Sequence, residues 1–292
     1  MQVFLQVIKP DCMKILTSIS STRDYIKSLI VENKQIGFVP TMGALHEGHL
    51  SLIEASNREN DITAVSIFVN PAQFNDEEDL QKYPRPIEKD IEILEKANCN
   101  FLFNPSPKEM YPFTQNISFD FGYLDKIMEG KHRPGHFSGV ALIVSKLFNI
   151  IQPQRAYFGK KDFQQLAIIK QMVKILNFPV SIKSCPIIRE KSGLAMSSRN
   201  NRLNDKERNE AALIYKTLND AVSFSENHTV NETKAMVMKV FEKHPFFEPE
   251  YFEIVEADTL KAIDNWDTEK DIIGCTAVNV GKVRLIDNVK FN

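Results

Sequence analysis

Short apolar runs alternate with stretches of helical periodicity along the first two thirds of the chain. Buried strands are predicted by apolar runs rich in β-branched and aromatic residues, at 36–39, 63–69, 101–103, 156–158 and 179–183. Helices are predicted where apolar positions recur with a helical period, at 48–60, 87–97, 137–151 and 163–177. Strands that alternate with helices of this length predict an α/β fold, in which helices cover both faces of a parallel sheet.

The pattern changes after residue 187. Helices are predicted at 205–223 and 230–243, followed by strands at 251–256, 272–280 and 283–286, the last two forming a hairpin that turns at Gly281 and Lys282. A chain of 292 residues is longer than one compact core usually organises. We therefore expect two domains, a catalytic one at 1–187 and a smaller α+β one at 188–292.

Composition narrows the class of protein. The chain has 36 Lys and Arg against 38 Asp and Glu, a net charge of −2, which argues against a nucleic-acid binder. The longest uncharged run, residues 62–75, is too short and too polar to span a membrane. Neither a secretion signal nor a cysteine framework is evident, so we expect a cytoplasmic protein with reduced thiols. Met13 is a second candidate start, which would make the first dozen residues an appendage.

The most informative segment is PTMGALHEGH at residues 40–49, directly after the first predicted strand. Gly43 permits a tight turn, and Gly48 leaves room for a ligand near the backbone. A helix that begins here offers free N–H groups and a dipole to an anion, and His46 and His49 can both reach one phosphate. Two alternatives remain open: histidines that only cap the helix, and a metal site, although zinc motifs of this kind space their histidines four residues apart.

Further segments extend this signature in a fixed order: VSIFVNPAQF (65–74), DLQKYPR (79–85), RPGHFSGV (133–140), FGKKDFQQL (158–166) and GLAMSSRN (193–200). Together they resemble the pantoate–β-alanine ligases, which belong to the HxGH nucleotidyltransferases. The resemblance implies a Rossmann-like catalytic domain and a reaction in two steps. Pantoate attacks ATP to form pantoyl adenylate and pyrophosphate, and β-alanine then displaces AMP to give pantothenate.

The resemblance also implies how ATP is held. His46, His49, Lys161 and Arg199 are the expected catalytic residues, because they can stabilise charge on the phosphates and on the leaving pyrophosphate. Asp162 can accept hydrogen bonds from the ribose hydroxyls. The ATP-binding residues expected from the resemblance are Met42, His46, His49, Gly159, Lys161, Asp162, Ile188, Met196, Ser197, Ser198 and Arg199.

The same resemblance assigns the pantoate site. Gln73 and Gln165 carry amides for the hydroxyl and carboxylate groups, and Arg133 is a further candidate contact. An apolar wall around the geminal methyl groups is expected from Pro40, Met42 and Phe74. Asn70 is expected beside the adenylate or β-alanine. His136 is expected to be a scaffold residue, and Tyr83 and Arg85 to lie near the entrance.

Mg²⁺ should accompany ATP, held mainly by phosphates and water. Asp90 is the best candidate ligand, although an exposed helix carboxylate is the plainer interpretation. Lys160 stands where the family usually has Glu, and Phe163 replaces a frequent Tyr. The resemblance further implies a homodimer and a second domain that closes as a lid carrying residues 197–199. The alternatives are another HxGH adenylyltransferase and a non-catalytic nucleotide-binding protein.

Overall fold

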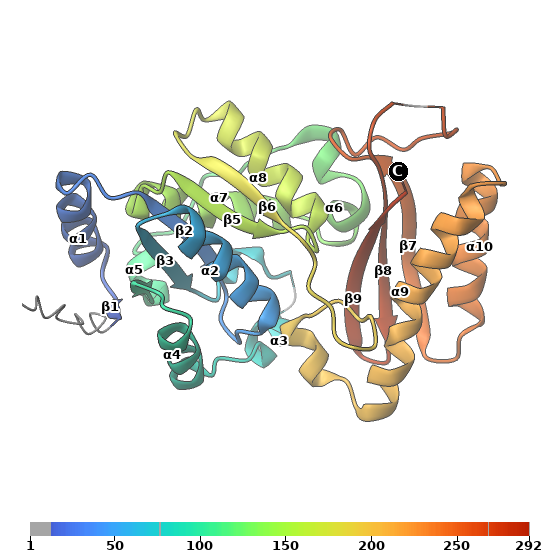
Figure 1. Cartoon of the computed structure of the whole chain (residues 1–292), viewed down its shortest axis with the longest axis horizontal. Coiled ribbons are helices and arrows are strands. Elements are labelled where there is room, and N and C mark those ends of the chain that lie inside the picture. Colours follow the sequence, from blue (N-terminus) through green and yellow to red (C-terminus); the bar gives the residue numbers. More distant parts are fainter. Residues whose placement is uncertain (1–12, 76, 268, 292) are drawn as a thin grey trace, which may run out of the picture.

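The computed structural model describes residues 13–75, 77–267 and 269–291. Two sheets lie side by side along the long axis of the molecule (Figure 1). The question of where translation starts concerns residues 1–12, which lie outside the described part. No helix within that part is long and apolar enough to cross a membrane.

The first sheet has six strands in the order β1-β4-β3-β2-β5-β6, and every paired neighbour is parallel. Its strands are β1 (Lys14–Leu16), β2 (Ile36–Thr41), β3 (Ile62–Ile67), β4 (Phe101–Phe103), β5 (Arg155–Gly159) and β6 (Ser181–Cys185). The predicted strands are all present, with shifts of a few residues at their ends. The edge strand β1 was not predicted, because its three residues are mostly exposed and form no apolar run.

Helices cover both faces of this sheet, as predicted. The main ones are α1 (Ile19–Val31), α2 (Glu47–Glu59), α4 (Ile87–Lys96), α7 (His136–Ile151) and α8 (Phe163–Ile175). One face packs on α1, α7 and α8, and the other face packs on α2 and α4. Three short helices, α3 (Glu77–Lys82), α5 (Pro107–Met110) and α6 (Met128–His132), lie in the connections.

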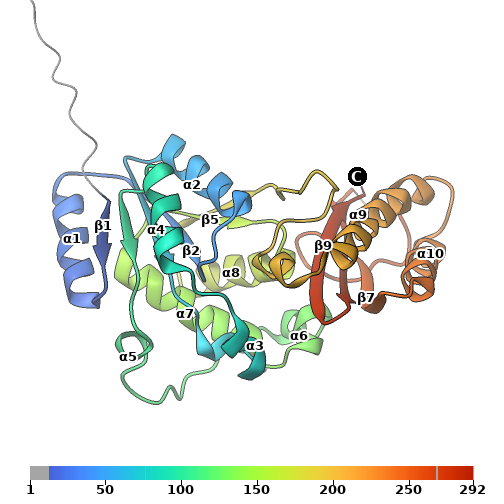
Figure 2. The same ribbon diagram turned by 90° about the horizontal axis from the view of Figure 1, so that it is seen from below.

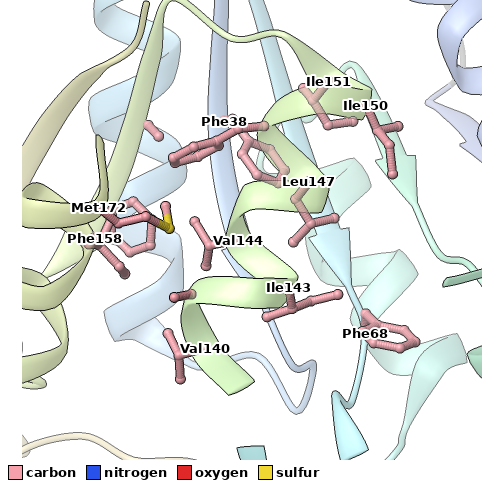
Figure 3. Packing of buried hydrophobic residues seen from close by; sticks show 14 of the residues in the cluster. Phe38, Phe68, Val140, Ile143, Val144, Leu147, Ile150, Ile151, Phe158 and Met172 are labelled. Atoms are coloured by element: carbon pink, nitrogen blue, oxygen red, sulfur yellow. The ribbon is translucent and has the colours of Figure 1, made fainter. Parts of the chain in front are cut away.

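Helix α7 is the centre of the first core. It is apolar almost all round, because it packs on the sheet on one side and on other elements on the other. Figure 3 shows Val144 and Leu147 of this helix beside Phe38 of β2, with Phe158 and Met172 close by. Such close packing fixes the height of the strand ends relative to the helices, and the candidate site lies at those ends.

The second sheet is antiparallel, in the order β7-β8-β9: β7 (Phe247–Glu256), β8 (Ile272–Val280) and β9 (Val283–Lys290). Helices α9 (Asp205–Ser225) and α10 (Val230–Lys243) pack on one of its faces. Its other face meets α6 and α8 of the first unit through an apolar cluster that includes Met128 and Tyr251. In both views β9 is the strand of this sheet nearest the first unit (Figures 1 and 2).

Candidate active site

The candidate site lies at the carboxyl ends of β2 and β5. The chain runs outward from β2 through β3 to β4, and later resumes beside β2 with β5 and β6. The connections that follow β2 and β5 therefore leave the sheet in opposite directions and open a crevice between them, which is where parallel α/β sheets bind ligands. The sequence places its two most polar motifs, at residues 40–49 and 158–166, in these two connections.

The loop between β2 and α2 is held by Asp90 of helix α4. Its carboxylate oxygens accept hydrogen bonds from the backbone N–H groups of Ala44 and Leu45, both at 2.8 Å. Gly43 and Ala44 both adopt left-handed backbone conformations, with φ of 82° and 51°. A Cβ on Gly43 would lie 2.9 Å from the Asp90 carboxylate, so the turn requires glycine here.

This contact corrects the expectation for Asp90. The residue is 1% exposed rather than on an open helix surface, and it lines neither of the cavities described below. Both carboxylate oxygens already accept bonds from the β2–α2 loop, so the geometry favours a loop-holding role over the predicted Mg²⁺ ligand. Burial raises the pKa of Asp90, and the two backbone hydrogen bonds oppose that rise.

His46 and His49 cap helix α2 in a defined tautomer. The N–H of Gly48 donates to Nδ1 of His46 at 3.1 Å, and the N–H of His46 donates to Nδ1 of His49 at 3.3 Å. A ring nitrogen that accepts from a backbone N–H carries no proton, so in each neutral ring the proton resides on Nε2. Both side chains line the cavity, and the two ring centroids lie 4.1 Å apart.

Both histidines are neutral at physiological pH. Burial, assisted by the positive charge of Lys161, lowers the pKa of His46 to about 4. Burial, together with His46 and Lys161, lowers the pKa of His49 to about 3. The pair therefore offers hydrogen-bond donors rather than positive charge, and Lys161 supplies the cation beside them.

Gly48 has a different role from the one expected. A Cβ at this position would lie 2.9 Å from the His46 imidazole. Glycine therefore makes room for the ring of His46 rather than for a ligand beside the backbone.

The residues predicted to bind ATP surround one cavity of about 220 Å³. All of them line it: Met42, His46, His49, Gly159, Lys161, Asp162, Ile188, Met196, Ser197, Ser198 and Arg199. They come from the ends of β2 and β5, from the start of α2, and from the segment that leads to α9. Lys161 and Asp162 follow β5, with Nζ of Lys161 3.7 Å from Oδ1 of Asp162.

Most of the residues predicted for pantoate line the same cavity, namely Pro40, Met42, Asn70, Gln73 and Gln165. Phe74 and Arg133 instead line an adjoining, more polar cavity of about 610 Å³. The two cavities share Lys161, Asp162, Ser197 and Arg199. The structure thus brings the predicted residues together around two adjoining cavities, and Phe74 and Arg133 line the larger of them.

Asn70 is buried with its amide fully engaged. Its Oδ1 accepts from the hydroxyl of Tyr111 at 2.6 Å, and its Nδ2 donates to Oε1 of Gln73 and to the carbonyl of Gly139, each at 3.1 Å. Gln73 in turn directs its Nε2 at Sδ of Met42, 3.0 Å away. Asn70 therefore orients Gln73, and it has little capacity left for a substrate.

Arg133 and His136 form a second anchored pair. Arginine has no acceptor, so Arg133 donates to Nε2 of His136 at 3.1 Å, and Nδ1–H of His136 donates to the carbonyl of Gln73 at 2.8 Å. Burial, assisted by Arg133, lowers the pKa of His136 to about 4. A neutral histidine that supports the backbone at Gln73 agrees with the scaffold role expected for it.

The segment that carries Ser197–Arg199 is tied to helix α3. Arg199 and Arg202 both donate to the carboxylate of Asp79, at 2.9 Å and 2.8 Å. The hydroxyl of Tyr83 lies 3.2 Å from Oγ of Ser198, so Tyr83 reaches the cavity. Arg85 does not, because its guanidinium donates to carbonyls at the end of α3, including those of Leu80 and Tyr83.

Lys160 and Phe163, the two departures from the family pattern, lie outside the 220 Å³ cavity. Lys160 is exposed and lines neither cavity in the described part of the chain. Phe163 packs with the apolar cluster between the two sheets, where a hydroxyl has no evident use.

Sequence reasoning missed the apolar floor and the supporting residues. Val140, Ile143, Val144 and Leu147 of α7 line the cavity, and the unbroken apolar character of this helix was a usable signal. Asp79 and Tyr111 gave no comparable signal, because a polar side chain on a loop or short helix does not disclose its distant partner. No group of three or more His, Cys, Asp or Glu suited to a metal occurs among the described residues.

Comparison with known proteins agrees with this site. The family model described as pantoate-beta-alanine ligase matches residues 14–290. The pantothenate synthetase of Bacteroides thetaiotaomicron is 49% identical over 279 residues, which cover 96% of this chain and 99% of the relative. That of Porphyromonas gingivalis (strain ATCC 33277) is 48% identical over the same shares of the two chains.

Solved structures give the same result. The pantothenate synthetase of Thermus thermophilus superposes with a TM-score of 0.89 at 39% identity, over 96% of this chain and 99% of that one. The pantoate-beta-alanine ligase of Francisella tularensis, solved with beta-gamma ATP and β-alanine, has a TM-score of 0.81 at 38% identity, over 96% and 98%. The match extends over both sheets and over every motif that forms the cavity, and the chain belongs to the pantoate-beta-alanine ligase family.

Proposed function

We propose that this chain, a ligase by family, joins pantoate to β-alanine by way of pantoyl adenylate in the 220 Å³ cavity. The observation that carries the proposal is the cluster of His46, His49 and Lys161, in which two neutral imidazoles with Nε2–H donors line the cavity beside one cation. This combination suits a polyphosphate that gains charge on one bridging oxygen as it leaves.

In the first step, a carboxylate oxygen of pantoate attacks the α-phosphorus of ATP, and the bond to the β-phosphate oxygen breaks. Pyrophosphate leaves with the electron pair of that bond, and the Nε2–H groups of His46 and His49 donate to its oxygens. Lys161 stabilises the same charge, and no protein nucleophile takes part. Catalysis in this step is positioning plus electrostatic stabilisation.

In the second step, the amine of β-alanine attacks the acyl carbon of pantoyl adenylate. The new C–N bond forms as the C–O bond to AMP breaks, AMP leaves with the electron pair of that bond, and the nitrogen loses a proton to water. Pantoate fits the end of the cavity where Gln73 and Gln165 present amides beside Pro40 and Met42. β-Alanine would enter through the adjoining 610 Å³ cavity. There Arg133, which also donates to His136 and lies 3.8 Å from the carboxylate of Glu129, has further N–H groups for the carboxylate of β-alanine.

Mg²⁺ would arrive with ATP and neutralise phosphate charge. The carboxylate in the wall of the 220 Å³ cavity belongs to Asp162. Asp90 instead accepts hydrogen bonds from the β2–α2 loop. The donor set therefore suits a metal held chiefly by phosphates and water.

We also propose a homodimer, a cytoplasmic location, and two domains at 1–187 and 188–292, of which the second closes over ATP. The homodimer rests on the family resemblance, and sedimentation equilibrium would test it.

The domain proposal is supported by the separate apolar cores of the two sheets. Small-angle scattering with and without ATP and pantoate tests the closure, and identical profiles would contradict it.

The reaction itself is tested with the purified protein, Mg²⁺-ATP, pantoate and β-alanine. We expect AMP, pyrophosphate and pantothenate in equal amounts, with pyrophosphate released from ATP and pantoate alone in the first turnover. Formation of ADP, or turnover that is indifferent to pantoate, would contradict the proposal and favour a different adenylyl-transferring or nucleotide-binding protein.

A further inference from the structure

Strand β9 has two faces with different tasks. Successive side chains of a strand point to opposite sides. Val283, Leu285 and Val289 pack into the core beneath α9 and α10. The alternate positions, Arg284, Ile286 and Asn288, contact the first unit. The hairpin was predicted from its sequence, but the face it presents to the first unit was not.

Arg284 and Ile286 attach this face to α6. Arg284 donates to both carboxylate oxygens of Glu129, each at 2.7 Å, and Ile286 packs on the cluster that contains Met128. Burial opposes the charge of Glu129, but Arg284 and a hydrogen bond from Tyr251 outweigh it and lower the pKa of this carboxyl to about 2. The pair is therefore charged at physiological pH and fixes the height of β9 beside the cavity.

Asn288 reaches the loop that carries Lys161. Its Nδ2 donates to the carbonyl of Lys160 at 2.9 Å and to that of Lys161 at 3.0 Å. Asn288 is 7% exposed, so these carbonyls would lose their partner without access to much water if the amide were removed. The N–H of Lys160 donates to the carbonyl of Cys185, which ties the same loop from its other side.

Asn288 is itself held in place. The carboxylate of the preceding residue, Asp287, accepts from the N–H of Asn288 at 2.8 Å and from two nitrogens of Arg189, at 2.7 Å and 2.9 Å. The guanidinium of Arg189 lies 3.6 Å from the centre of the Tyr215 ring. Arg189 directly follows Ile188, which lines the cavity. Both ends of this chain of contacts therefore lie at the ATP cavity.

We propose that Asn288 is a positioning residue for the adenylation step. By holding the carbonyls of Lys160 and Lys161, it sets the backbone from which the Lys161 side chain extends toward the phosphates. The catalytic lysine of the first unit is thereby placed by a residue of the second, so the site is complete only when β9 is docked. This inference rests on the proposed function, because it concerns the same reaction.

The direct test is Asn288→Ala, with Asn288→Asp as a near-isosteric variant that replaces the donor with an acceptor. We expect kcat for pyrophosphate release to fall about 10-fold or more in both, since 1.4 kcal/mol corresponds to a factor of about ten. The KM for pantoate should stay within about twofold, because the acid is held by other residues. Asn149→Ala is the matched control: it removes an amide whose Nδ2 also donates to a backbone carbonyl, that of Ser145 at 3.0 Å, near the end of α7 and away from β9.

A double-mutant cycle separates positioning from general support of the fold. In a Lys161→Ala background, Asn288→Ala should cost less than about twofold, because its effect passes through the missing lysine. The same loss in both backgrounds, or a kcat for Asn288→Ala equal to that of Asn149→Ala, would overturn the inference. Thermal unfolding of every variant shows whether it is folded. A wild-type protein that releases no pyrophosphate would instead contradict the proposed function.

Discussion

The two walls of the ATP cavity are held by different kinds of contact. The wall formed by the β2–α2 loop is held by hydrogen bonds from buried backbone N–H groups to Asp90 and to the histidine rings. A second wall, at 197–199, is held by the ion pair from Arg199 to Asp79 on the short helix α3, a carboxylate that also pairs with Arg202. Only the second kind of contact involves groups that a phosphate can replace.

The first wall is therefore already arranged for phosphate before ATP binds, whereas the arginine of the second wall changes its partner when ATP binds. Neutral imidazoles whose tautomers are fixed by the backbone need no rearrangement when ATP arrives. A guanidinium already paired with one carboxylate can exchange that partner for phosphate oxygens, which also accept two parallel hydrogen bonds. We therefore expect the first wall to contribute to the rate of chemistry, and the second to contribute chiefly to binding.

The largest expected effect comes from removing Lys161, the cation in the β5–α8 connection that lies beside the two histidines of the first wall. Lys161→Ala should lower kcat for pyrophosphate release by about 10²–10³-fold, as loss of one preorganised transition-state contact does. Rapid-quench measurement of the first turnover checks this. Lys160→Ala is the matched control, because it removes an exposed lysine from the same loop while keeping the backbone. Equal losses in the two variants would show that the total positive charge of the β5–α8 connection matters, and not the position of Lys161.

A second test loosens the β2–α2 loop by changing Asp90, which does not line the cavity. Asp90→Asn should lower the free energy of unfolding by about 1–3 kcal/mol, because one of two buried N–H groups would face an NH₂. Urea titration measures this loss. The concentration of Mg²⁺ that gives half-maximal rate should not change. A shift of that midpoint with normal stability would restore Asp90 as a metal ligand.

The second wall should respond more weakly. In Asp79→Asn, Arg199 and Arg202 lose their shared charge partner, so we expect a change of about 3–10-fold in the KM for ATP and a smaller change in kcat. The KM of the variant should also depend on salt more steeply than that of the wild type, because loss of the Asp79 carboxylate leaves more net positive charge to attract ATP. A fall in kcat as large as that for Lys161→Ala would remove the distinction between the two walls.

A separate test of the first wall concerns pH. The pKa of His49 is about 3 in the folded protein and 6.5 when it is unperturbed, so the unfolded chain takes up the proton first. This histidine therefore contributes stability above pH 6.5 that is lost progressively as the pH falls toward 3. His49→Asn should make the free energy of unfolding less dependent on pH between about 6.5 and 4.5. Equal pH dependence in the two proteins would show that the ring is not held neutral.

The sequence predicts the cavity better than it predicts what supports it. The pattern of strands and helices placed residues 40–49 directly after a predicted strand, and the family resemblance supplied roles for the side chains of this and the other motifs. The support comes from partners far apart along the chain, such as Asp79 and Arg199, or Asn288 and Lys161, 120 and 127 positions apart. No local period records such pairs, because they depend on how the two sheets dock. Asp90 shows the same limit, since a carboxylate on a helix is exposed by default.

The packing of α7 against residues 71–73 has a consequence for substrate choice. A Cβ on Gly139 would lie 2.1 Å from the carbonyl oxygen of Ala72, so even alanine would push this segment away from the helix. Gln73 would move with it, and the acid-binding end of the cavity would change its width. Gly139 does not line the cavity, yet we expect it to limit the size of the acid that fits, and variants designed to accept bulkier hydroxy acids can begin there.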